Sequence, residues 1–471
     1  MRDAAVYTAA LSHLQRFEFE RCKAAAVRAR VRDFTDGERS SAFFLGLEKN
    51  RQEKAVIRAL RDKDGVLCVQ PEKILKGVEW FYSDLFRERG CDVTAIDECL
   101  QHVNSRLSEE EVGVCEADVC GAEIRTAIMR KHNNKSPGAD VLTAEFYKAF
   151  QAELLPILQQ LFAAFFRGQA PLAFFCLGTV KLIYKRKGER CDLANYRPIT
   201  LLNLDYKILA SVFAGRMREV IPSFLSSTQA YGVPGRDIVD VILSLRYSVG
   251  HTAQSVVLSV DFVKAFDKVE HSFLWHVLDR FGFGPLFVSR LKSLYDSATS
   301  LVACNGLLTG VFGVQRSIRQ GCPLSAMLYS LTVEPLALLV NKTSNISGVI
   351  TPARSEVKIF QYADDTTLVL RDEHSVDAAL KRLTLFCGAS GAEVNFMKSV
   401  IWFLGDRTGT RNGWGFREAE GGFKVLGVWL SGDSHQVALK NWHGVLSKIS
   451  GILSLWKLRR LTWRGKVVVI N

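Results

Sequence analysis

Short apolar runs alternate with longer helical patterns along most of this chain. β-Rich apolar runs at residues 179–184, 256–261, 357–361 and 366–370 have the length and composition of strands. Between them, apolar residues recur at helical spacing, so that one predicted face carries Phe273, Leu274, Val277, Leu278 and Phe281. Strands mixed with helices predict an α/β (α+β) core rather than an all-helical one.

Both ends of the chain have helical patterns and many bases. Residues 1 to about 60 carry a basic face, which is either simply solvated or able to follow phosphates. In the last fifty residues the apolar positions share one helical face, which we expect to pack in a core: Trp442, Val445, Leu446, Ile449, Ile452, Leu453 and Trp456. The bases around that stripe could grip a duplex backbone: Lys440, Lys448, Lys457, Arg459, Arg460, Arg464 and Lys466.

Local signals divide the first part of the chain. Residues 62–65 (Asp-Lys-Asp-Gly) predict a hairpin turn between the runs at 55–60 and 66–69. Ser108, followed by three glutamates, resembles a helix start. Because residues 90–120 are acidic and irregular, we place a boundary there. The prediction is a basic helical region over 1–120, a mixed core over 121–430 and a helical segment over 431–471.

Three aspartates stand at the ends of apolar runs. Asp364 and Asp365 separate two β-rich runs, and Asp261 ends another. A solvated turn would explain adjacent aspartates equally well, because Asp tolerates turn backbone. However, carboxylates close to a core edge carry a desolvation cost that a bound cation removes. Three such acids at strand ends are what a two-metal nucleotidyl-transfer site needs, with its ions roughly 3.5–4 Å apart.

Composition narrows the class of partner. The chain has 471 residues, a formal charge of +12 and a pI near 9.2, which favours an anionic partner such as nucleic acid over a merely basic protein. The longest apolar stretch, residues 154–166, is too short to span a bilayer, and we expect no membrane association. The 11 cysteines lack Cys-x-x-Cys spacing, so neither a disulfide framework nor a zinc site is expected. Reduced intracellular thiols fit better.

Three further residues are ambiguous when each is considered alone. Phe266 lies five residues beyond Asp261, where a bulky ring would exclude a 2′-hydroxyl, but its helical position also suits a core residue. Gln320 offers an amide to a base or sugar edge, and Gly321 permits close backbone approach. Taken alone, residues 317–325 predict only a turn that leads into an apolar helix.

The ordered set of motifs resembles the reverse transcriptase of non-LTR (LINE-type) retrotransposons. The motifs occupy residues 134–140 (Asn-Lys-Ser-Pro-Gly-Ala-Asp), 194–202 (Ala-Asn-Tyr-Arg-Pro-Ile-Thr-Leu-Leu), 233–236 (Val-Pro-Gly-Arg), the block that begins at Asp261, 319–325 (Arg-Gln-Gly-Cys-Pro-Leu-Ser), 362–365 (Tyr-Ala-Asp-Asp), 391–398 (Gly-Ala-Glu-Val-Asn-Phe-Met-Lys) and 423–427 (Phe-Lys-Val-Leu-Gly). They run from about 130 to 430, and the flanking segments extend the resemblance to nearly the whole chain. The chain departs from the family pattern at Ala326, where the family often has proline, and at Ala230–Gly232.

The resemblance implies a role for each matching residue. It assigns metal binding to Asp261, Asp364 and Asp365, with two Mg²⁺ ions expected and Mn²⁺ as an alternative. It makes Phe266 the sugar gate and Lys398 the group that protonates or steadies pyrophosphate, although Lys398 could also be an ordinary surface lysine. The remaining implied contacts are to substrate: Arg197 with Lys185 or Lys187 on the triphosphate, Gln320 and Gly321 around the nascent base pair, and Tyr362 as a further substrate-binding residue.

The resemblance also implies a fold, an activity and partners. The fold would be a right-hand polymerase in which residues 121–430 form helical fingers and an antiparallel-sheet palm, and residues 431–471 form the start of a truncated helical thumb. The activity would be RNA-directed DNA polymerisation. The partners would be an RNA template, a DNA primer, target DNA and deoxynucleoside triphosphates, in nuclear and cytoplasmic ribonucleoprotein. An endonuclease would be encoded upstream, so the chain would be a fragment or a decayed copy.

Two alternatives stay open at this point. The chain could be a catalytically silent nucleic-acid-binding remnant, or a related polymerase of group II intron, retron or telomerase type. The long basic region before the core and residues 319–325 favour the LINE-type interpretation.

Overall fold

The computed structural model describes residues 56–172, 174–250, 254–350, 355–405 and 413–457. The predicted basic helices of residues 1–55 lie outside these ranges, as do the bases from Arg459 onward. The chain divides into two compact units. The first unit contains the described residues up to Tyr82 together with Thr179–Ile199 and Leu301–Val311, and the second contains Ser83–Gly178, Thr200–Ser300 and the remainder from Phe312.

The first unit begins with a small hairpin. Strands β1 (Leu60–Arg61) and β2 (Leu67–Cys68) pair antiparallel around the Asp62–Gly65 turn. The Asp62 amide donates to the Val66 carbonyl at 2.9 Å, and Gly65 takes a φ of +80°, which favours glycine. The predicted hairpin is therefore confirmed, with strands shorter than expected.

A second sheet contains strand residues that the division assigns to both units. Its strand order is β4 (Tyr196–Leu202), β3 (Leu177–Tyr184), β6 (Thr299–Cys304) and β7 (Leu307–Leu308). β8 (Phe312–Gly313) pairs with Thr299 and Ser300 at the start of β6. The apolar run predicted at 179–184 is thus a strand.

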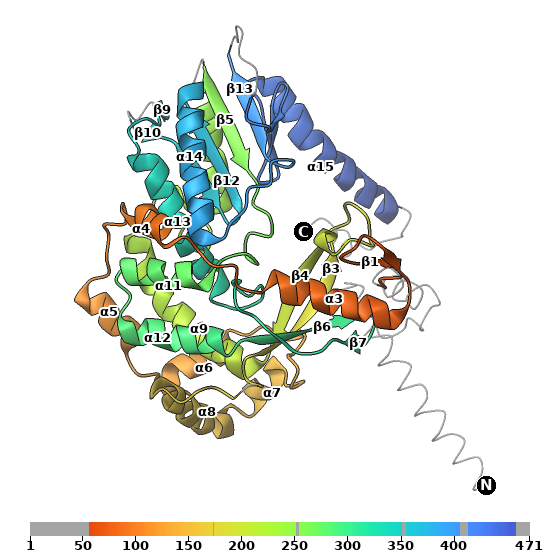
Figure 1. Cartoon of the computed structure of the whole chain (residues 1–471), viewed down its shortest axis with the longest axis vertical. Helices are drawn as coiled ribbons and strands as arrows, with labels where there is room; N and C mark the ends of the chain where they lie inside the picture. Colours follow the sequence, from red (N-terminus) through yellow and green to blue (C-terminus); the bar gives the residue numbers. More distant parts are fainter. Residues whose placement is uncertain (1–55, 173, 251–253, 351–354, 406–412, 458–471) are drawn as a thin grey trace, which may run out of the picture. The chain divides into compact units, whose positions relative to one another are not determined.

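The main sheet of the second unit has the central strand β5 (Ser255–Val260). Its order is β11 (Ile359–Tyr362), β12 (Asp365–Leu370), β5, β13 (Val400–Leu404) and β14 (Arg417–Glu418), and β5 pairs antiparallel with both neighbours (Figure 1). Two further pairs are β9 (Val349–Ile350) with β10 (Glu356–Val357), and β15 (Phe423–Val425) with β16 (Val428–Leu430). The three predicted strands of this region are confirmed.

Helices make up most of the remaining described structure. They are α3 (Pro71–Leu85), α4 (Val93–Leu100), α5 (Glu109–Glu116), α6 (Gly121–Met129), α7 (Ala144–Ala149), α8 (Gln151–Phe166), α9 (Leu204–Val220), α10 (Ile238–Gly250), α11 (His271–Arg280), α12 (Pro285–Asp296), α13 (Ser325–Lys342), α14 (Glu373–Ser390) and α15 (Ser434–Lys457), with short 3₁₀ turns η1 (Leu193–Asn195) and η2 (Ile221–Ser223). The mixed architecture confirms an α/β (α+β) class.

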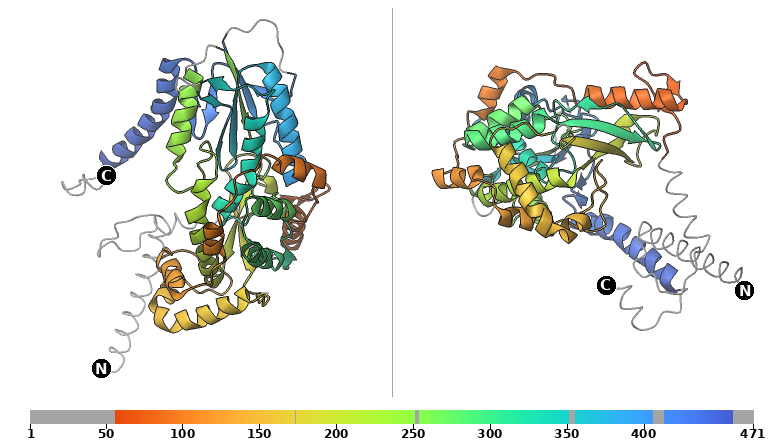
Figure 2. Two further views of the ribbon diagram at one scale, coloured as in Figure 1. Left: turned by 90° about the vertical axis from the view of Figure 1, so that its left-hand side faces the viewer. Right: turned by 90° about the horizontal axis from the view of Figure 1, so that it is seen from below.

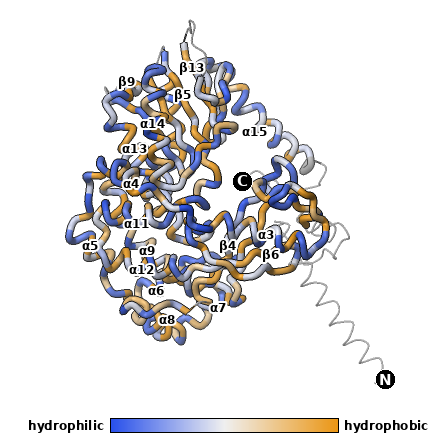
Figure 3. The backbone as a smooth tube through the Cα atoms, in the orientation of Figure 1, coloured by the Kyte–Doolittle hydropathy of each residue, from blue (hydrophilic) through white to orange (hydrophobic). Residues whose placement is uncertain are grey.

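Both faces of the main sheet are covered. Val256, Leu258 and Val260 of β5 join a core that includes α11, α13 and α14, whereas Val257 joins a smaller core with α10 and the β15–β16 hairpin. Figure 2 shows α14 and α10 on opposite sides of the strands, and the strands are largely apolar in Figure 3. A strand buried on both faces needs a nearly continuous apolar sequence, which explains the run that precedes Asp261.

One expectation about the core is wrong. The predicted apolar face of α11 is buried, but that of α15 is exposed in its described side chains; Trp442 is 62% exposed and Ile449 is 47% exposed. α15 is anchored at its beginning, where Asn441 exchanges two hydrogen bonds with the backbone of Trp429 in β16. Beyond Asn441, no other described segment covers the stripe.

One smaller sequence feature, the predicted helix start at Ser108, is confirmed. Ser108 caps α5 in a capping box with Glu111. The ten cysteines in the described part of the chain are all free thiols. No helix among the described residues is long and apolar enough to cross a membrane.

Candidate active site

Strand register gathers the three predicted aspartates. Thr366 of β12 is paired with Val260 of β5, so the next positions in the same register are Asp365 and Asp261. Asp364 lies in the two-residue turn that joins β11 to β12, next to the Tyr362–Asp365 pair. Antiparallel pairing therefore brings carboxylates from distant parts of the sequence to one end of the central strands.

The turn itself has unusual backbone. Ala363 has a φ of +53°, a region that residues with a Cβ rarely adopt. Such strain persists only when the surrounding structure holds it, and here β11 and β12 pair on both sides of the turn. The carboxylate of Asp364 is thereby presented at a fixed place beyond the sheet.

The carboxylates affect one another electrostatically. Asp365 keeps accessible surface, yet the protein around its carboxylate removes enough water to raise its pKa to about 6. The negative charges of Asp364 and Asp261 add to this shift. A cation placed among the three groups would relieve both the repulsion and the desolvation cost.

Asp261 is fixed through its backbone on both sides. Its amide donates to the Ser399 hydroxyl at 3.0 Å, and its carbonyl accepts from the Asn395 amide at 2.8 Å. Directly after Asp261, Phe262 forms a bridge with Val394. The side chain of Asp261, which is 38% exposed, therefore projects from a rigid base.

The same loop positions Lys398. The Lys398 ammonium lies 3.9 Å from the Asp261 carboxylate, and its side chain is 65% exposed. Because Asn395 and Ser399 both hydrogen-bond Asp261, the loop that carries Lys398 is tied to the carboxylate cluster. The structure brings this predicted residue to the predicted metal ligands.

The donor set suits a hard divalent cation. No group of three or more His, Cys, Asp or Glu side chains in the described ranges is already arranged to hold an ion. However, Asp261, Asp364 and Asp365 offer only carboxylate oxygens, the ligands that Mg²⁺ prefers, and their mutual repulsion favours a cation. The chemistry of these three carboxylates therefore fits a divalent metal ion such as Mg²⁺.

A row of aromatic rings lies beside the acids. Tyr362 meets Tyr231 edge-on at 5.4 Å between centroids, Tyr231 meets Phe266 at 6.2 Å, and Phe266 stacks on Tyr329 at 4.1 Å. Phe266 is half-buried against the core, so the structure places it between the two roles that the sequence left open. Burial, with Asp364 and Asp365 nearby, raises the pKa of Tyr329, which keeps this phenol neutral.

Gln320 and Gly321 make contacts within the protein, with Asp267 and with the backbone of Thr200. The side-chain amide of Gln320 donates to the buried Asp267 carboxylate at 3.1 Å. The backbone carbonyl of Gln320 accepts from the backbone amide of Thr200 at 2.9 Å. Gly321 has a φ of +111°, and a Cβ there would lie 2.5 Å from the Thr200 carbonyl oxygen. The expected close approach at Gly321 is therefore real, and its partner in the protein is Thr200.

Arg197 and Lys185 belong to the first unit. Arg197 is an exposed residue of β4, and its side chain forms no hydrogen bond or ion pair with other described residues. Lys185 follows β3, and its ammonium donates to the Ala194 carbonyl at 3.0 Å. Arg197 thus lies on β4, and Lys185 directly follows the neighbouring strand β3 of the same sheet.

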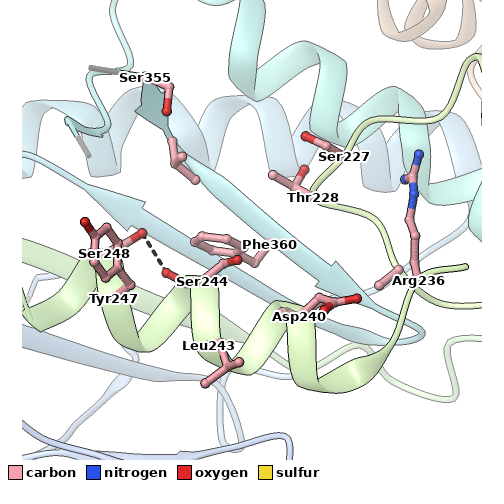
Figure 4. Close-up of a pocket in the computed structure, with 13 residues that line it drawn as sticks. Ser227, Thr228, Arg236, Asp240, Leu243, Ser244, Tyr247, Ser248, Ser355 and Phe360 are labelled. Carbon is pink, nitrogen blue, oxygen red and sulfur yellow. Dashed lines mark hydrogen bonds between the residues drawn. The ribbon is translucent and has the colours of Figure 1, made fainter. Parts of the chain in front are cut away.

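A separate cavity of about 610 Å³ lies between α10 and the strands that lead to the turn (Figure 4). Phe360 of β11 and the hydroxyls of Ser244, Ser248 and Thr228 line it, and the Ser248 hydroxyl donates to the Ser244 carbonyl at 2.9 Å. Arg236 points its guanidinium to the carbonyls of Leu225, Ser226 and Gln229. None of the predicted site residues lines this cavity.

Sequence reasoning missed several residues that support the site. Asn395 belongs to the motif at residues 391–398 and Ser399 directly follows it, but their hydrogen bonds to Asp261 join segments far apart in sequence. Tyr231 lies in the segment noted only as a departure from the family pattern. Asp267 carried no separate signal.

The comparisons with known proteins agree with the motifs. The family model for reverse transcriptase (RNA-dependent DNA polymerase) matches residues 183–430. The chain is similar to an uncharacterised 149 kDa protein of transposon TX1 from Xenopus laevis, with 33% identity over 97% of this chain and 35% of the relative. It is also similar to Pol polyproteins of R2 retrotransposable elements, from Popillia japonica (26% identity over 50% of this chain and 33% of the relative) and Drosophila melanogaster (22% identity over 74% and 32%). The chain thus spans about a third of the length of these curated relatives.

Proposed function

This chain belongs to the reverse transcriptase (RNA-dependent DNA polymerase) family, in its non-LTR retrotransposon type, and on that premise we propose that it extends a primer 3′ end on an RNA template. The observation that carries the proposal is the shared register of β5 and β12, which aligns Asp261 with Asp365 beside Asp364. Carboxylates converging at strand ends suit phosphoryl transfer, whose catalysis is mostly positioning and charge neutralisation.

Asp261, Asp364 and Asp365 would hold two Mg²⁺ ions, with Mn²⁺ as an alternative. When bound, such ions activate the attacking hydroxyl and neutralise the leaving pyrophosphate. The pKa of Asp365, raised to about 6, still leaves this carboxylate mostly ionised at neutral pH and ready to bind a cation.

Lys398 would hold a proton near the leaving group. Its ammonium lies beside Asp261 yet stays largely exposed, which lets it reach an anionic substrate. A positioned general acid typically contributes roughly 10²–10⁴-fold to rate. The bonds from Asn395 and Ser399 to Asp261 keep the Lys398 loop close to the chemistry.

The remaining predicted contacts surround the incoming nucleotide. Phe266, held between Tyr231 and Tyr329, would exclude a 2′-hydroxyl, and Tyr362 would support the primer end. Gln320 and Gly321 would line the nascent base pair. Arg197, with Lys185, would bind the triphosphate, because a guanidinium binds phosphate oxygens in pairs.

The architecture fits a right-hand polymerase. The main sheet would be the palm, the helices and strands of 121–430 outside it would complete the fingers, and α15 would begin the thumb. The partners would be an RNA template, a DNA primer, target DNA and deoxynucleoside triphosphates. We place the protein in intracellular ribonucleoprotein, with an endonuclease encoded upstream.

Primer extension tests the function. We expect the native chain, given Mg²⁺, deoxynucleotides and an RNA template annealed to a DNA primer, to extend the primer. Asp261→Asn and Asp364→Asn should each reduce the rate by roughly 10³-fold or more, because electrostatic stabilisation of the transition state usually contributes most to such catalysis. Asp279→Asn is the matched control, since this exposed α11 carboxylate is not part of the proposed site.

Two results would contradict the proposal. If primer extension survives both substitutions, these carboxylates are not the ligands of the catalytic metal ions. A folded native chain that binds template–primer but never extends it would instead be the silent nucleic-acid-binding remnant. Salt dependence of binding cannot separate these alternatives, because both involve phosphate contacts.

A further inference from the structure

A cationic pocket adjoins the loop that carries Gly321. It has a volume of about 400 Å³, and its walls come from the segment after α6, the start of α9 and the Gly321–Pro323 loop. Four bases contribute to it: Arg130, Lys131, Lys135 and Lys207. No Asp or Glu is among the described residues that line it.

The positive charge of this pocket is incompletely neutralised by the protein. Arg130, Lys135 and Lys207 form no side-chain hydrogen bond or ion pair with the described part of the chain. Burial lowers the pKa of Lys207, although the nearby Cys322 and Asp140 oppose this shift. Burial, with the charge of Lys207 also contributing, lowers the pKa of Lys131 to about 8. An anion in the pocket would remove this electrostatic cost.

Of these four bases, Lys131 is held in place by hydrogen bonds to α9. The Lys131 ammonium donates to the Lys207 carbonyl at 3.0 Å and to the Ser211 hydroxyl on α9. The Lys148 ammonium in turn donates to the carbonyl of Lys131. The segment after α6 is thus fixed against α9, and the opening between them has a defined shape.

The pocket has apolar walls as well as charge. Pro137, Leu142, Leu202, Leu204 and Pro323 contribute apolar surface, and Ser136 and Thr143 supply hydroxyls. Apolar surface accepts the face of a base, while cations and hydroxyls accept phosphate and sugar oxygens. The size and the lining suit a single nucleotide.

The neighbouring cavity offers a contrast. It has a volume of about 420 Å³ and shares Arg130, Lys131 and Pro323 with the cationic pocket. Its other charges are balanced, because Arg216 forms an ion pair with Glu123, and Arg218 is accompanied by Glu219. Carboxylates are therefore part of the wall of this neighbouring cavity, whereas none lines the pocket beside Gly321 among the described residues.

We propose that this pocket holds the first unpaired nucleotide of the template strand, ahead of the nascent base pair. The inference rests on the proposed function, in which Gln320 and Gly321 line that pair. Gly321 is part of the pocket wall, and its backbone is held against Thr200. The template nucleotide next to that pair, which has yet to be copied, would therefore lie at the pocket, and Lys135 and Lys207 would contact its phosphate.

Template overhang length provides the test. Binding of the full chain is measured to RNA–DNA duplexes with the same primer and either a blunt end or two unpaired template nucleotides, the first of them 2-aminopurine. We expect the overhang to increase native affinity roughly tenfold, as one stacked base and a phosphate contact would. The 2-aminopurine emission should change on binding, because the base enters a new environment.

Variants then locate the effect. The double variant Lys135→Gln/Lys207→Gln should lose the overhang gain while keeping blunt-duplex affinity within about twofold, and its salt slope on overhang duplexes should fall by about one to two. Lys207→Arg keeps the charge and should retain the gain, which guards against a variant that fails to fold. Arg218→Gln, an exposed base further along α9, is the matched control and should resemble the native chain.

Three results would overturn the inference. The first is that the native chain binds overhang and blunt duplexes with equal affinity. The second is that the double variant weakens binding of blunt and overhang duplexes equally. The third is that free deoxynucleotide or inorganic phosphate reverses the change in 2-aminopurine emission. Primer extension is read separately on the same proteins. A native chain that shows the overhang gain but does not extend would contradict the proposed polymerase activity and leave the pocket assignment in place.

Discussion

Helices α11 and α15 have similar apolar stripes in sequence but opposite environments in the structure. On α11, Phe273, Leu274, Val277 and Leu278 are buried in the main core. On α15, the stripe that begins at Trp442 is exposed in its described side chains. Periodicity shows which residues would share a face, but burial depends on whether another segment covers that face.

The difference has a simple structural origin. α11 follows β5 closely in sequence and packs with α13 and α14 on the same side of the sheet, so its stripe meets a surface formed by several segments. α15 contacts β16 near its beginning, and the rest of its length has no such surface among the described segments. Two helices with similar apolar stripes therefore contribute unequally to the stability of the fold.

Matched alanine substitutions test this comparison most strongly. Leu278→Ala should lower the free energy of unfolding by about 2–5 kcal/mol, because it leaves a cavity in a packed core. Leu446→Ala should change it by less than about 0.5 kcal/mol, as expected of an exposed site. Denaturant unfolding of both variants measures the contrast, and a large effect of Leu446→Ala would show that α15 is covered in solution.

A buried charge sharpens the comparison further. Glu334 on α13 is fully buried, and burial raises its pKa to about 7 despite hydrogen bonds from Ser226 and the nearby charge of Arg236. The folded state therefore retains a proton that the unfolded state releases, so wild-type stability falls as pH rises from about 4.5 to 7.

Glu334→Gln removes that titration. Its remaining oxygen can still accept from the Ser226 amide, so the variant should gain stability over the wild type as pH rises, by up to about 3 kcal/mol at pH 8. Thermal unfolding at pH 5 and pH 8 measures the gain. Glu420→Gln, at an exposed site, should give no such pH dependence, and a constant offset for Glu334→Gln would contradict the raised pKa.

An effect of intermediate size should come from a helix end. Ser108 accepts from the Glu111 amide, and Glu111 accepts from the Ser108 amide. Ser108→Ala should cost about 1 kcal/mol, less than a core substitution and more than an exposed one. Unfolding of this variant at neutral pH provides the measurement, and a cost as large as that of Leu278→Ala would mean that α5 supports more of the fold than its few buried residues suggest.

Local chemistry explains what could be predicted from sequence. The strands were evident from β-branched apolar runs, the hairpin at residues 62–65 from its turn residues, and the α5 cap from Ser108 and Glu111. The three aspartates stood out because each follows or precedes an apolar strand. In each case the signal and the structure lie within a few residues of one another.

Long-range packing explains what could not be predicted. The contact between Gly321 and Thr200, and the hydrogen bond from Asp261 to Ser399, join segments whose spacing contains no trace of their pairing. The exposure of α15 likewise depends on which segment faces it. The roles of the site residues remain predictions, since they concern substrates rather than contacts within the chain.

The bonds around Asp261 also have a consequence for folding. Asp261 and Ser399 are 138 positions apart, and β13, which follows Ser399, completes the pairing of β5. Contacts between such distant positions form late, because a long loop must close before they are gained. During synthesis, β5 leaves the ribosome well before its β13 partner. Until β13 has been synthesised, the edge of β5 that pairs with it stays open to mispairing. Correct folding therefore depends on the chain past residue 404 following promptly.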